Sequence, residues 1–433
     1  MYLFYSLLLG CLALLSAPWW LVQMLRLGKY RAGLRERLGA VPPRVLHEAA
    51  PGGIWVHAVS VGEVLAVSQL VGELKNAHPE KPAFVSTTTA TGQQLARQRF
   101  GENRVFFMPL DFGFTLRPYL RALQPSLLIL AETEFWPNLL HLAKQSGAKL
   151  AIVNARISDR SFPRYRRFAW FFRRVLGDVN LFLAQTEEDA LRLREIGAPA
   201  ERVQVSGNLK FDIRLSARSA MVDDLRRAIS RESPVIVCGS TTEGEEELLL
   251  AAFQQVLRQH PAAVMILAPR HPERFERAAG LISSTGIPMF RRSAWNVGNQ
   301  LSGCVFLLDS VGELASVYAL ADVAFVGGSL VPVGGHNILE PAQHGVAVLT
   351  GPHTFNFREI VRIFEQGGRE HGGLRVVTAE SLAPQLLELL ANPQRRQALG
   401  LRAQQLFKDN TGATARTLQA LETLLAGQGS ATQ

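Results

Sequence analysis

Beyond about residue 50, short apolar runs rich in β-branched residues alternate with longer stretches whose apolar positions have helical spacing. The first set of predicted strands covers 54–59, 83–87, 104–108, 127–130, 150–153, 181–184 and 203–205. The second set covers 235–238, 264–267, 305–308, 323–326, 346–349 and 375–377. Because these strands are apolar along their length, both faces of each sheet must be covered. We therefore expect parallel sheets with helices on each side.

The stretch 212–234 separates the two sets, because it is polar and charged and contains no strand pattern. We therefore expect an α/β protein with two doubly wound, Rossmann-like domains that face a cleft. One covers 40–211, the other covers 235–425 with the C-terminal helices, and 212–234 links them. Ligands of such sheets bind beyond the carboxyl ends of the strands. The residues that end each predicted strand are therefore the candidates for chemistry.

The first 25 residues contain no charged side chain, and about 20 apolar residues are enough for a helix to cross a bilayer. Trp19 and Trp20 lie near the end of this segment, as interfacial aromatic residues do, and basic residues follow from Arg26. A cleaved signal peptide would have its positive charges before the apolar run. We therefore expect an uncleaved anchor over 1–26, with the rest of the chain in the cytoplasm. Because Pro18 can kink a helix, a segment that lies in the membrane surface is the alternative.

The 433-residue chain has a net charge of +9, which fits nucleic acid, anionic lipid or a phosphorylated substrate without choosing among them. Its 3 cysteines have no CxxC spacing, so neither a disulfide framework nor a zinc site is predicted. No Asp-x-Asp pair or histidine pair has metal-ligand spacing, so we expect no metal and no cofactor. The absence of a GxSxG elbow and of a Walker loop argues against hydrolases and ATPases.

Two glycine pairs follow the predicted strand 323–326. Gly327-Gly328 come directly after it, and Gly334-Gly335 lead into the segment from Asn337 to Glu340. Glycines allow a close approach to a ligand, and the start of a helix attracts phosphate. Glu340 would accept hydrogen bonds from a ribose, so the segment is a plausible seat for a nucleotide donor. Two ordinary glycine turns would give the same pattern.

Acidic residues end two predicted strands of the first set. Glu63 follows the first strand at the start of a helix, where it would stabilise the helix or act as a general base. A base needs a raised pKa, which requires partial burial because the helix dipole lowers it. Glu132 and Glu134 follow the strand 127–130, with Arg156 or Lys210 as possible partners in an ion-pair network.

Polar residues also end strands of the second set. The sequence Ser240-Thr241-Thr242 has the signature of a helix cap, and its hydroxyl groups would also suit a phosphate. Arg270, between two prolines, would clamp a phosphate or carboxylate in a fork.

The stretch 156–174 interleaves arginines with aromatic residues. Such interleaving occurs in proteins that bind nucleic acid. Beside an N-terminal anchor, it favours a helix on an anionic membrane, and we expect no nucleic acid partner.

Seven motifs in order resemble one family. They are Ser-Val-Gly-Glu at 60–63, Glu-Thr-Glu-Phe-Trp-Pro-Asn at 132–138, Asn-Ala-Arg at 154–156, Gly-Asn-Leu-Lys-Phe-Asp at 207–212, Pro-Arg-His-Pro-Glu-Arg-Phe at 269–275, Gly-Gly-His-Asn at 334–337 and Gly-Pro-His-Thr-Phe-Asn-Phe at 351–357. The chain thus resembles the bacterial 3-deoxy-D-manno-octulosonic acid (Kdo) transferases of lipopolysaccharide biosynthesis. The resemblance implies a glycosyltransferase B fold at the inner membrane. It also implies inverting transfer of Kdo from CMP-Kdo to a phosphorylated lipid A precursor, lipid IVA.

The resemblance also implies roles for particular residues. Glu63 would be the general base, and Glu132 and Lys210 would stabilise the transition state. The positions that match the CMP site are Pro269, Arg270, Val311, Gly312, Glu313, Asn337, Ile338, Leu339 and Glu340, of which Ile338 and Leu339 would offer only backbone. The alternatives are a nucleotide-sugar epimerase of the same fold and a membrane-tethered protein that binds an anionic ligand. An epimerase needs no lipid acceptor, so the N-terminal segment and the arginine-rich stretch count against it.

Overall fold

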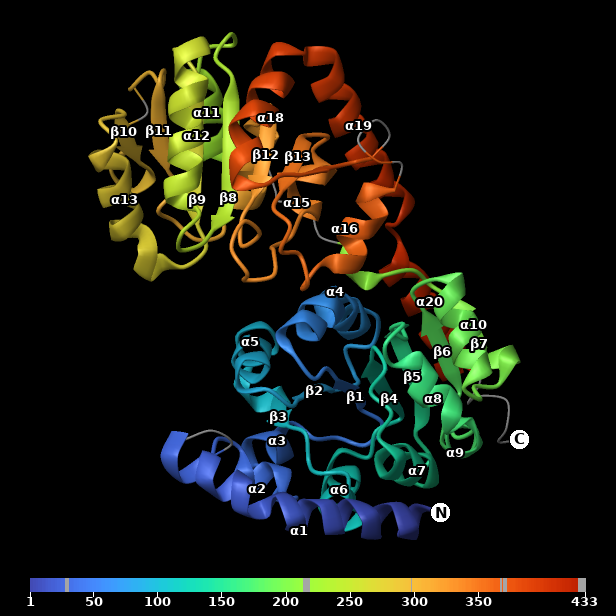
Figure 1. The fold of residues 1–433 in the computed structure, drawn as a ribbon. Helices are drawn as coiled ribbons and strands as arrows, with labels where there is room; N and C mark the ends of the chain where they lie inside the picture. Colours follow the sequence, from blue (N-terminus) through green and yellow to red (C-terminus); the bar gives the residue numbers. More distant parts are fainter. Residues whose placement is uncertain (28–30, 213–218, 297, 367, 369–371, 427–433) are drawn as a thin grey trace. The chain divides into compact units, whose positions relative to one another are not determined.

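The chain folds into two compact units in the computed structural model, which describes residues 1–433 except 28–30, 213–218, 297, 367, 369–371 and 427–433 (Figure 1). Unit 1 comprises Met1–Asp212 and Thr411–Gln433, and unit 2 comprises Ile213–Asn410. Each unit contains one seven-stranded parallel sheet covered by helices on both faces, which confirms the predicted doubly wound α/β fold.

The sheet of unit 1 has the strand order β3-β2-β1-β4-β5-β6-β7. The strands are β1 (Ile54–His57), β2 (Ala83–Thr87), β3 (Val105–Phe107), β4 (Leu127–Ala131), β5 (Lys149–Ala155), β6 (Leu181–Ala184) and β7 (Val203–Val205). Its helices are α1 (Tyr2–Leu27), α2 (Leu34–Arg37), α3 (Pro43–Glu48), α4 (Val61–Ala77), α5 (Ala90–Phe100), α6 (Gly113–Leu123), α7 (Pro137–Gln145), α8 (Phe162–Arg167), α9 (Ala169–Leu176), α10 (Glu187–Glu195) and α20 (Ala413–Ala426), with 3-10 turns η1 (Glu102–Arg104), η2 (Ala200–Arg202) and η3 (Leu209–Phe211).

Successive residues of each strand enter opposite cores, because side chains alternate across a sheet. In β1, Trp55 packs in the core that contains Phe106 and Tyr119. Val56 packs on the other face of the sheet, in the core that contains Val67 and Leu70 of α4. Both faces are therefore apolar, which explains why the strand sequences show continuous rather than alternating hydrophobicity.

The sheet of unit 2 has the strand order β10-β11-β9-β8-β12-β13-β14. The strands are β8 (Val235–Thr241), β9 (Val264–Pro269), β10 (Met289–Arg291), β11 (Cys304–Leu307), β12 (Val323–Val326), β13 (Ala347–Thr350) and β14 (Arg375–Val376). Its helices are α11 (Ala220–Ala228), α12 (Glu246–Gln259), α13 (Phe275–Ser284), α14 (Leu314–Val317), α15 (Leu339–Gln343), α16 (Arg358–Glu365), α18 (Ala379–Ala391) and α19 (Pro393–Asp409), with 3-10 turns η4 (Pro272–Arg274), η5 (Arg292–Ala294) and η6 (Tyr318–Leu320). The edge strand β10 was not predicted, because its 3 residues are only half-buried and form no apolar run.

The division of the chain differs from the expected one in two places. Part of the expected linker 212–234 lies outside the described residues, and another part forms α11, which buries Leu225 in unit 2. Helix α20, expected with the second domain, belongs to unit 1, where Leu421 joins the core beside α4. Asp212 holds this return of the chain, since its carboxylate accepts hydrogen bonds from the backbone N–H groups of Gly412, at 2.6 Å, and Thr414.

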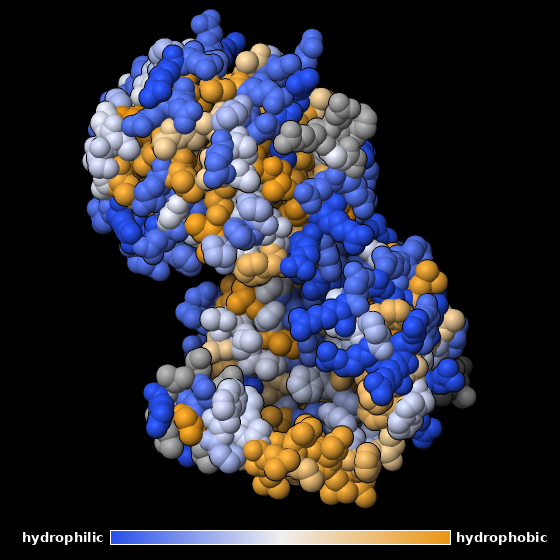
Figure 2. Space-filling view, viewed as in Figure 1, coloured by the Kyte–Doolittle hydropathy of each residue, from blue (hydrophilic) through white to orange (hydrophobic). Residues whose placement is uncertain are grey.

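Helix α1 lies on the surface of unit 1 and exposes an apolar face. The stretch Tyr2–Met24 is long and apolar enough to cross a membrane. Near its start, the hydroxyl group of Tyr2 donates to Asp178 at 2.9 Å, and the side-chain amide of Asn138 donates to Ser6 at 2.9 Å. Along the rest of the helix large side chains such as Leu14 and Leu15 are 77% and 80% exposed, and Figure 2 shows a hydrophobic surface in this region.

Candidate functional site

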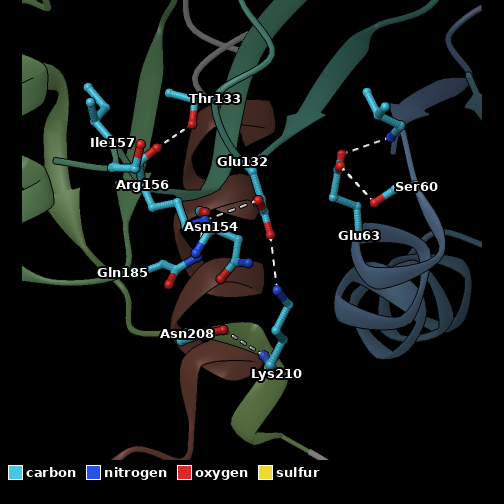
Figure 3. A network of polar contacts seen from close by, with 12 residues as sticks. Ser60, Glu63, Glu132, Thr133, Asn154, Arg156, Ile157, Gln185, Asn208 and Lys210 are labelled. Atoms are coloured by element: carbon cyan, nitrogen blue, oxygen red, sulfur yellow. Dashed lines mark hydrogen bonds and ion pairs between the residues drawn. The ribbon is translucent and has the colours of Figure 1, made fainter. Parts of the chain in front are cut away.

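Glu63 lies in the first turn of α4, directly after β1, and is only 8% exposed. Its carboxylate accepts hydrogen bonds from the backbone N–H of Val59, at 2.8 Å, and from the hydroxyl group of Ser60, at 3.1 Å (Figure 3). Burial raises the pKa of Glu63 to about 7, and the neighbouring carboxylates of Glu132 and Glu134 act in the same direction. Burial therefore outweighs the hydrogen bonds that favour the ionised form, which is the condition that a glutamate must meet to act as a base near neutral pH.

Glu132 follows β4 and joins two cations in one network. Its carboxylate lies 3.2 Å from the guanidinium of Arg156 and 3.2 Å from the ammonium group of Lys210 (Figure 3). Lys210 lies in η3, whose first turn is capped by the side chain of Asn208 through a 3.0 Å hydrogen bond from the backbone N–H of Lys210. The structure thus provides both of the partners that the sequence suggested for this acid.

Three residues at strand ends adopt backbone conformations that favour glycine. The φ angles are +56° at Glu132 and +54° at both Asn154 and Ser240. A left-handed conformation is unfavourable for residues with a Cβ atom, and such strain gathers at functional sites. Glu132 and Asn154 lie at the ends of the neighbouring strands β4 and β5, so unit 1 concentrates two strained residues beside its ion pairs.

The sequence-predicted residues of unit 2 form two groups. In the first, the side-chain amide of Asn337 donates to Glu340 at 3.3 Å, and burial raises the pKa of Glu340 while the charge of Arg270 lowers it. Ile338 and Leu339 have buried side chains, so only their backbone is available to a ligand.

Arg270 completes this first group. It is exposed and follows the buried Pro269 of β9, and its backbone N–H donates to the carbonyl oxygen of Thr241 at 2.9 Å. Its guanidinium is therefore open to solvent while its backbone is fixed to the end of β8.

The second group surrounds Glu313, before α14. Glu313 pairs with Arg292 at 3.2 Å and accepts a hydrogen bond from Ser310. Gly312 has a φ of +90°, and Val311 is exposed. Arg292 lies in η5, outside every motif considered in the sequence, so its link to Glu313 depends on the folding of two distant segments.

Glu245 is a functional candidate that the sequence did not reveal. It is fully buried, and its carboxylate accepts hydrogen bonds from the backbone N–H groups of Thr242, Gly328, Ser329 and Leu330 at 2.7 to 2.9 Å. The hydroxyl group of Thr242 donates to the same carboxylate at 3.0 Å. Glu245 thus fixes the loop that follows β12. The sequence has four glutamates over 243–247 and does not show that Glu245 and Glu246 are the two that point inward.

The glycines of this loop are required by packing within the unit. A Cβ atom on Gly327 would lie 2.6 Å from the carbonyl oxygen of Ser240, and one on Gly328 would lie 2.7 Å from the ring of His336. The first glycine pair is therefore explained without a ligand. Ser240 and Thr241 lie in β8 and Thr242 follows it, and none of the three caps α12, whose N-cap is Glu245. The predicted cap was wrong, because the strand continues through a bulge at its end.

Over the described residues, no group of three or more His, Cys, Asp or Glu side chains is placed to hold a metal ion. Cations near the acids of both units are instead supplied by arginine and lysine side chains, such as Arg156 and Lys210.

Two doubly wound units with polar groups at the strand ends define a protein of the glycosyltransferase B fold class. Residues 32–213 match the family model described as 3-deoxy-D-manno-octulosonic-acid transferase (kdotransferase). A 3-deoxy-D-manno-octulosonic acid transferase of Haemophilus influenzae is 36% identical over 405 residues, which cover 92% of each chain. One of Bordetella pertussis is 38% identical over 396 residues, with 89% of this chain and 90% of the relative covered. The chain belongs to this family of glycosyltransferases.

A solved structure shares the fold at much lower identity. The UDP-GlcNAc 2-epimerase of Neisseria meningitidis bound to UDP-GlcNAc has a TM-score of 0.54 and 13% sequence identity, and the match covers 86% of this chain and all of the epimerase. This likeness concerns the fold alone. Family membership therefore favours the transferase over the epimerase alternative.

Proposed function

We propose that the protein transfers Kdo from CMP-Kdo to a phosphorylated lipid A precursor, lipid IVA, with inversion at the anomeric carbon. This would place it in the EC 2.4.99 class of glycosyltransferases. Unit 1 would bind the acceptor, and unit 2 would bind the donor. The observation that supports this best is the state of Glu63, a buried carboxyl group with a pKa of about 7 that accepts hydrogen bonds at the carboxyl end of β1.

Glu63 is proposed as the general base. The hydroxyl oxygen of the acceptor attacks the anomeric carbon of Kdo, and the hydroxyl proton passes to Glu63. The bond from that carbon to the phosphate oxygen of CMP breaks, and CMP leaves with the bonding electron pair. A base with a pKa near the working pH is deprotonated often enough to accept the proton and basic enough to hold it.

Glu132 and Lys210 are proposed to stabilise the transition state. As the bond to CMP breaks, the sugar ring gains oxocarbenium character, which a carboxylate stabilises. The sugar also carries a carboxylate, which the ammonium group of Lys210 would attract. The 3.2 Å ion pair between the two side chains keeps both charges in place before the substrate arrives, so little reorganisation is needed.

The CMP part of the donor is assigned to unit 2. Arg270 offers an exposed guanidinium that suits a phosphate, and the hydrogen-bonded pair Asn337 and Glu340 suits a ribose. Pro269, the segment Val311-Gly312-Glu313 and the backbone of Ile338 and Leu339 complete the proposed site.

We also propose attachment to the inner membrane with both units in the cytoplasm. The exposed apolar face of α1 supports the attachment. Its contacts from Tyr2 and Ser6 to unit 1 favour a helix that lies along the membrane surface over one that crosses it, because a crossing helix would separate those side chains from Asp178 and Asn138. Trp170 of α9 is 71% exposed beside arginines of the same surface, which would contact anionic headgroups.

The proposal is tested by incubating the purified full-length protein with CMP-Kdo and lipid IVA and weighing the products by mass spectrometry. We expect a lipid heavier by one or more Kdo residues. Glu63→Ala should lower turnover by about 10²–10⁴-fold while CMP still binds, because only the base is removed. Full turnover by Glu63→Ala would exclude Glu63 as the base, and an isomerised sugar from donor alone would restore the epimerase alternative.

A further inference from the structure

Asn154 is a buried residue in a conformation that favours glycine. It lies near the end of β5, is fully buried, and has a φ of +54°. The pairing of β5 with β6 shifts register between Ile152 and Ala155, so one extra residue of β5 is accommodated at this point. A bulge of this kind re-aims a side chain and is common beside active sites. The chain therefore departs from regular strand geometry at Asn154.

The re-aimed side chain holds the segment that carries Lys210. The Oδ1 atom of Asn154 accepts a hydrogen bond from the backbone N–H of Leu209 at 3.0 Å. Lys210 is the next residue, and its ammonium group lies 3.2 Å from Glu132. Figure 3 shows Asn154 among Glu132, Gln185 and Lys210.

The backbone at Asn154 and the residue before it is itself held by two hydrogen bonds. Its carbonyl oxygen accepts a hydrogen bond from the side-chain amide of Gln185 at 3.0 Å. The residue before it, Val153, accepts a hydrogen bond from the backbone N–H of Glu132 at 2.9 Å. The same short piece of β5 therefore fixes the backbone of Glu132 on one side and the backbone beside Lys210 on the other.

A contribution to stability alone does not explain why an asparagine occupies position 154. Its left-handed backbone is less favourable than a regular strand conformation, although asparagine tolerates it better than most residues, and its Nδ2 atom is buried without a hydrogen-bond partner among the described residues. Both features oppose folding. Strain of this kind is kept where it places a functional group, and the group placed here is the backbone of Lys210.

We propose that Asn154 is a positioning residue for Kdo transfer, which sets Lys210 against Glu132 through the backbone of Leu209. The inference rests on the proposed role of Lys210. Asn154 acts through Lys210 and needs no contact with either substrate.

The test uses Asn154→Gly in the full-length protein. Glycine adopts the positive φ without strain and removes only the carboxamide. We expect a melting temperature within a few degrees of the wild type and a fall in kcat of roughly 10²-fold, because a small misplacement of a catalytic group has an effect of this size. The KM for CMP-Kdo should stay unchanged, since the proposed donor residues belong to unit 2. Asn154→Asp keeps the acceptor for Leu209 and should recover most of the lost kcat.

Two further variants make the result specific. Gln124 also has a positive φ, of +37°, but ends α6 away from the strand ends that carry the site, so Gln124→Gly should leave turnover unchanged. If Asn154 acts through Lys210, adding Asn154→Gly to Lys210→Ala should lower kcat no further.

The outcomes separate the inference from the function on which it rests. A wild-type kcat in Asn154→Gly would overturn the positioning role, and so would losses of kcat that multiply in the double variant. In either case a lowered kcat in Lys210→Ala would still support the proposed role of Lys210. Full turnover by Lys210→Ala would instead remove the proposed role of Lys210 and the inference with it.

Discussion

The pKa of Glu63 results from opposing effects of its surroundings. Burial and the charges of Glu132 and Glu134 raise its pKa, whereas the hydrogen bonds from Val59 and Ser60 lower it. The balance, a pKa of about 7, leaves the side chain ionised in about half of the molecules at neutral pH. Proton transfer in either direction then needs little free energy, which suits a group that must take up a proton and later release it.

The pH dependence of the reaction follows from this balance. A base acts when deprotonated, so kcat/KM for the acceptor should rise with pH through about 7 and level off above it. The profile is measured by initial rates at saturating CMP-Kdo between about pH 5.5 and about pH 9, within which a group of this pKa titrates fully. Ser60→Ala removes a hydrogen bond that lowers the pKa and should shift the midpoint upward. A rate that falls across this range would contradict the assignment of Glu63.

Some properties of individual residues could not be predicted from the sequence. It placed Glu63, Glu132 and Lys210 after strands, and the structure brings them together at the carboxyl ends of the strands of the unit 1 sheet. It did not give the extent of burial that raises the pKa of Glu63, because burial depends on packing with distant residues. The positive φ angles of Glu132 and Asn154 were also invisible, since neither residue is a glycine.

Among the elements, the loop after β12 depends on one buried carboxylate. Glu245 accepts hydrogen bonds from three consecutive N–H groups, those of Gly328, Ser329 and Leu330. An anion bound by adjacent backbone donors is a strong local restraint, because charge-assisted hydrogen bonds are about twice as strong as neutral ones. The loop leads through Gly334 and Gly335 to Asn337, so its shape sets the position of the proposed nucleotide residues.

Glu245→Gln should test this restraint. The amide would direct an NH₂ group at backbone N–H donors, so we expect a loss of roughly 3 kcal/mol in the free energy of unfolding and a raised KM for CMP-Kdo. Glu243 is a matched control, since it lies in the same turn, is exposed and pairs with Arg274 and Arg277. Glu243→Gln should cost about 0.5 kcal/mol or less. Equal losses measured by urea unfolding would show that the buried carboxylate has no special role.

Most strands were predicted to within a few residues, because apolar runs report burial on both faces of a strand. The misses share one cause. Edge strand β10 and helix α11 are short, and α20 has an amphipathic pattern that fits either core. Long-range packing decides where such elements belong, and hydrogen bonds such as those from Gly412 and Thr414 to Asp212 leave no local pattern in the sequence.

At the scale of the whole molecule, charge and apolar surface are concentrated in the same unit. The net charge is +9, and arginines of α8 and α9 are exposed near half-buried aromatic side chains. The ring of Phe171 in α9 lies 6.2 Å from that of Tyr5 in α1. The apolar helix and the basic surface are therefore neighbours within unit 1.

Vesicle binding should depend on both features. The protein should sediment with vesicles that contain phosphatidylglycerol more than with pure phosphatidylcholine, and the difference should shrink between about 0.1 M and about 0.5 M salt, because salt screens the arginine charges. Replacing Arg164, Arg166 and Arg167 by serine should weaken binding to anionic vesicles by up to about 1 kcal/mol per residue. Binding that ignores both lipid charge and salt would assign the attachment to α1 alone.

The return of α20 to unit 1 has a consequence for synthesis on the ribosome. The chain leaves unit 1 after Asp212 and re-enters it at Thr411, and Leu421 of α20 then fills a place in its core. The ribosome must therefore synthesise all of unit 2 before α20 emerges and can pack into unit 1. The unit that is translated first is completed last, and its unfilled core must be tolerated or protected until translation ends.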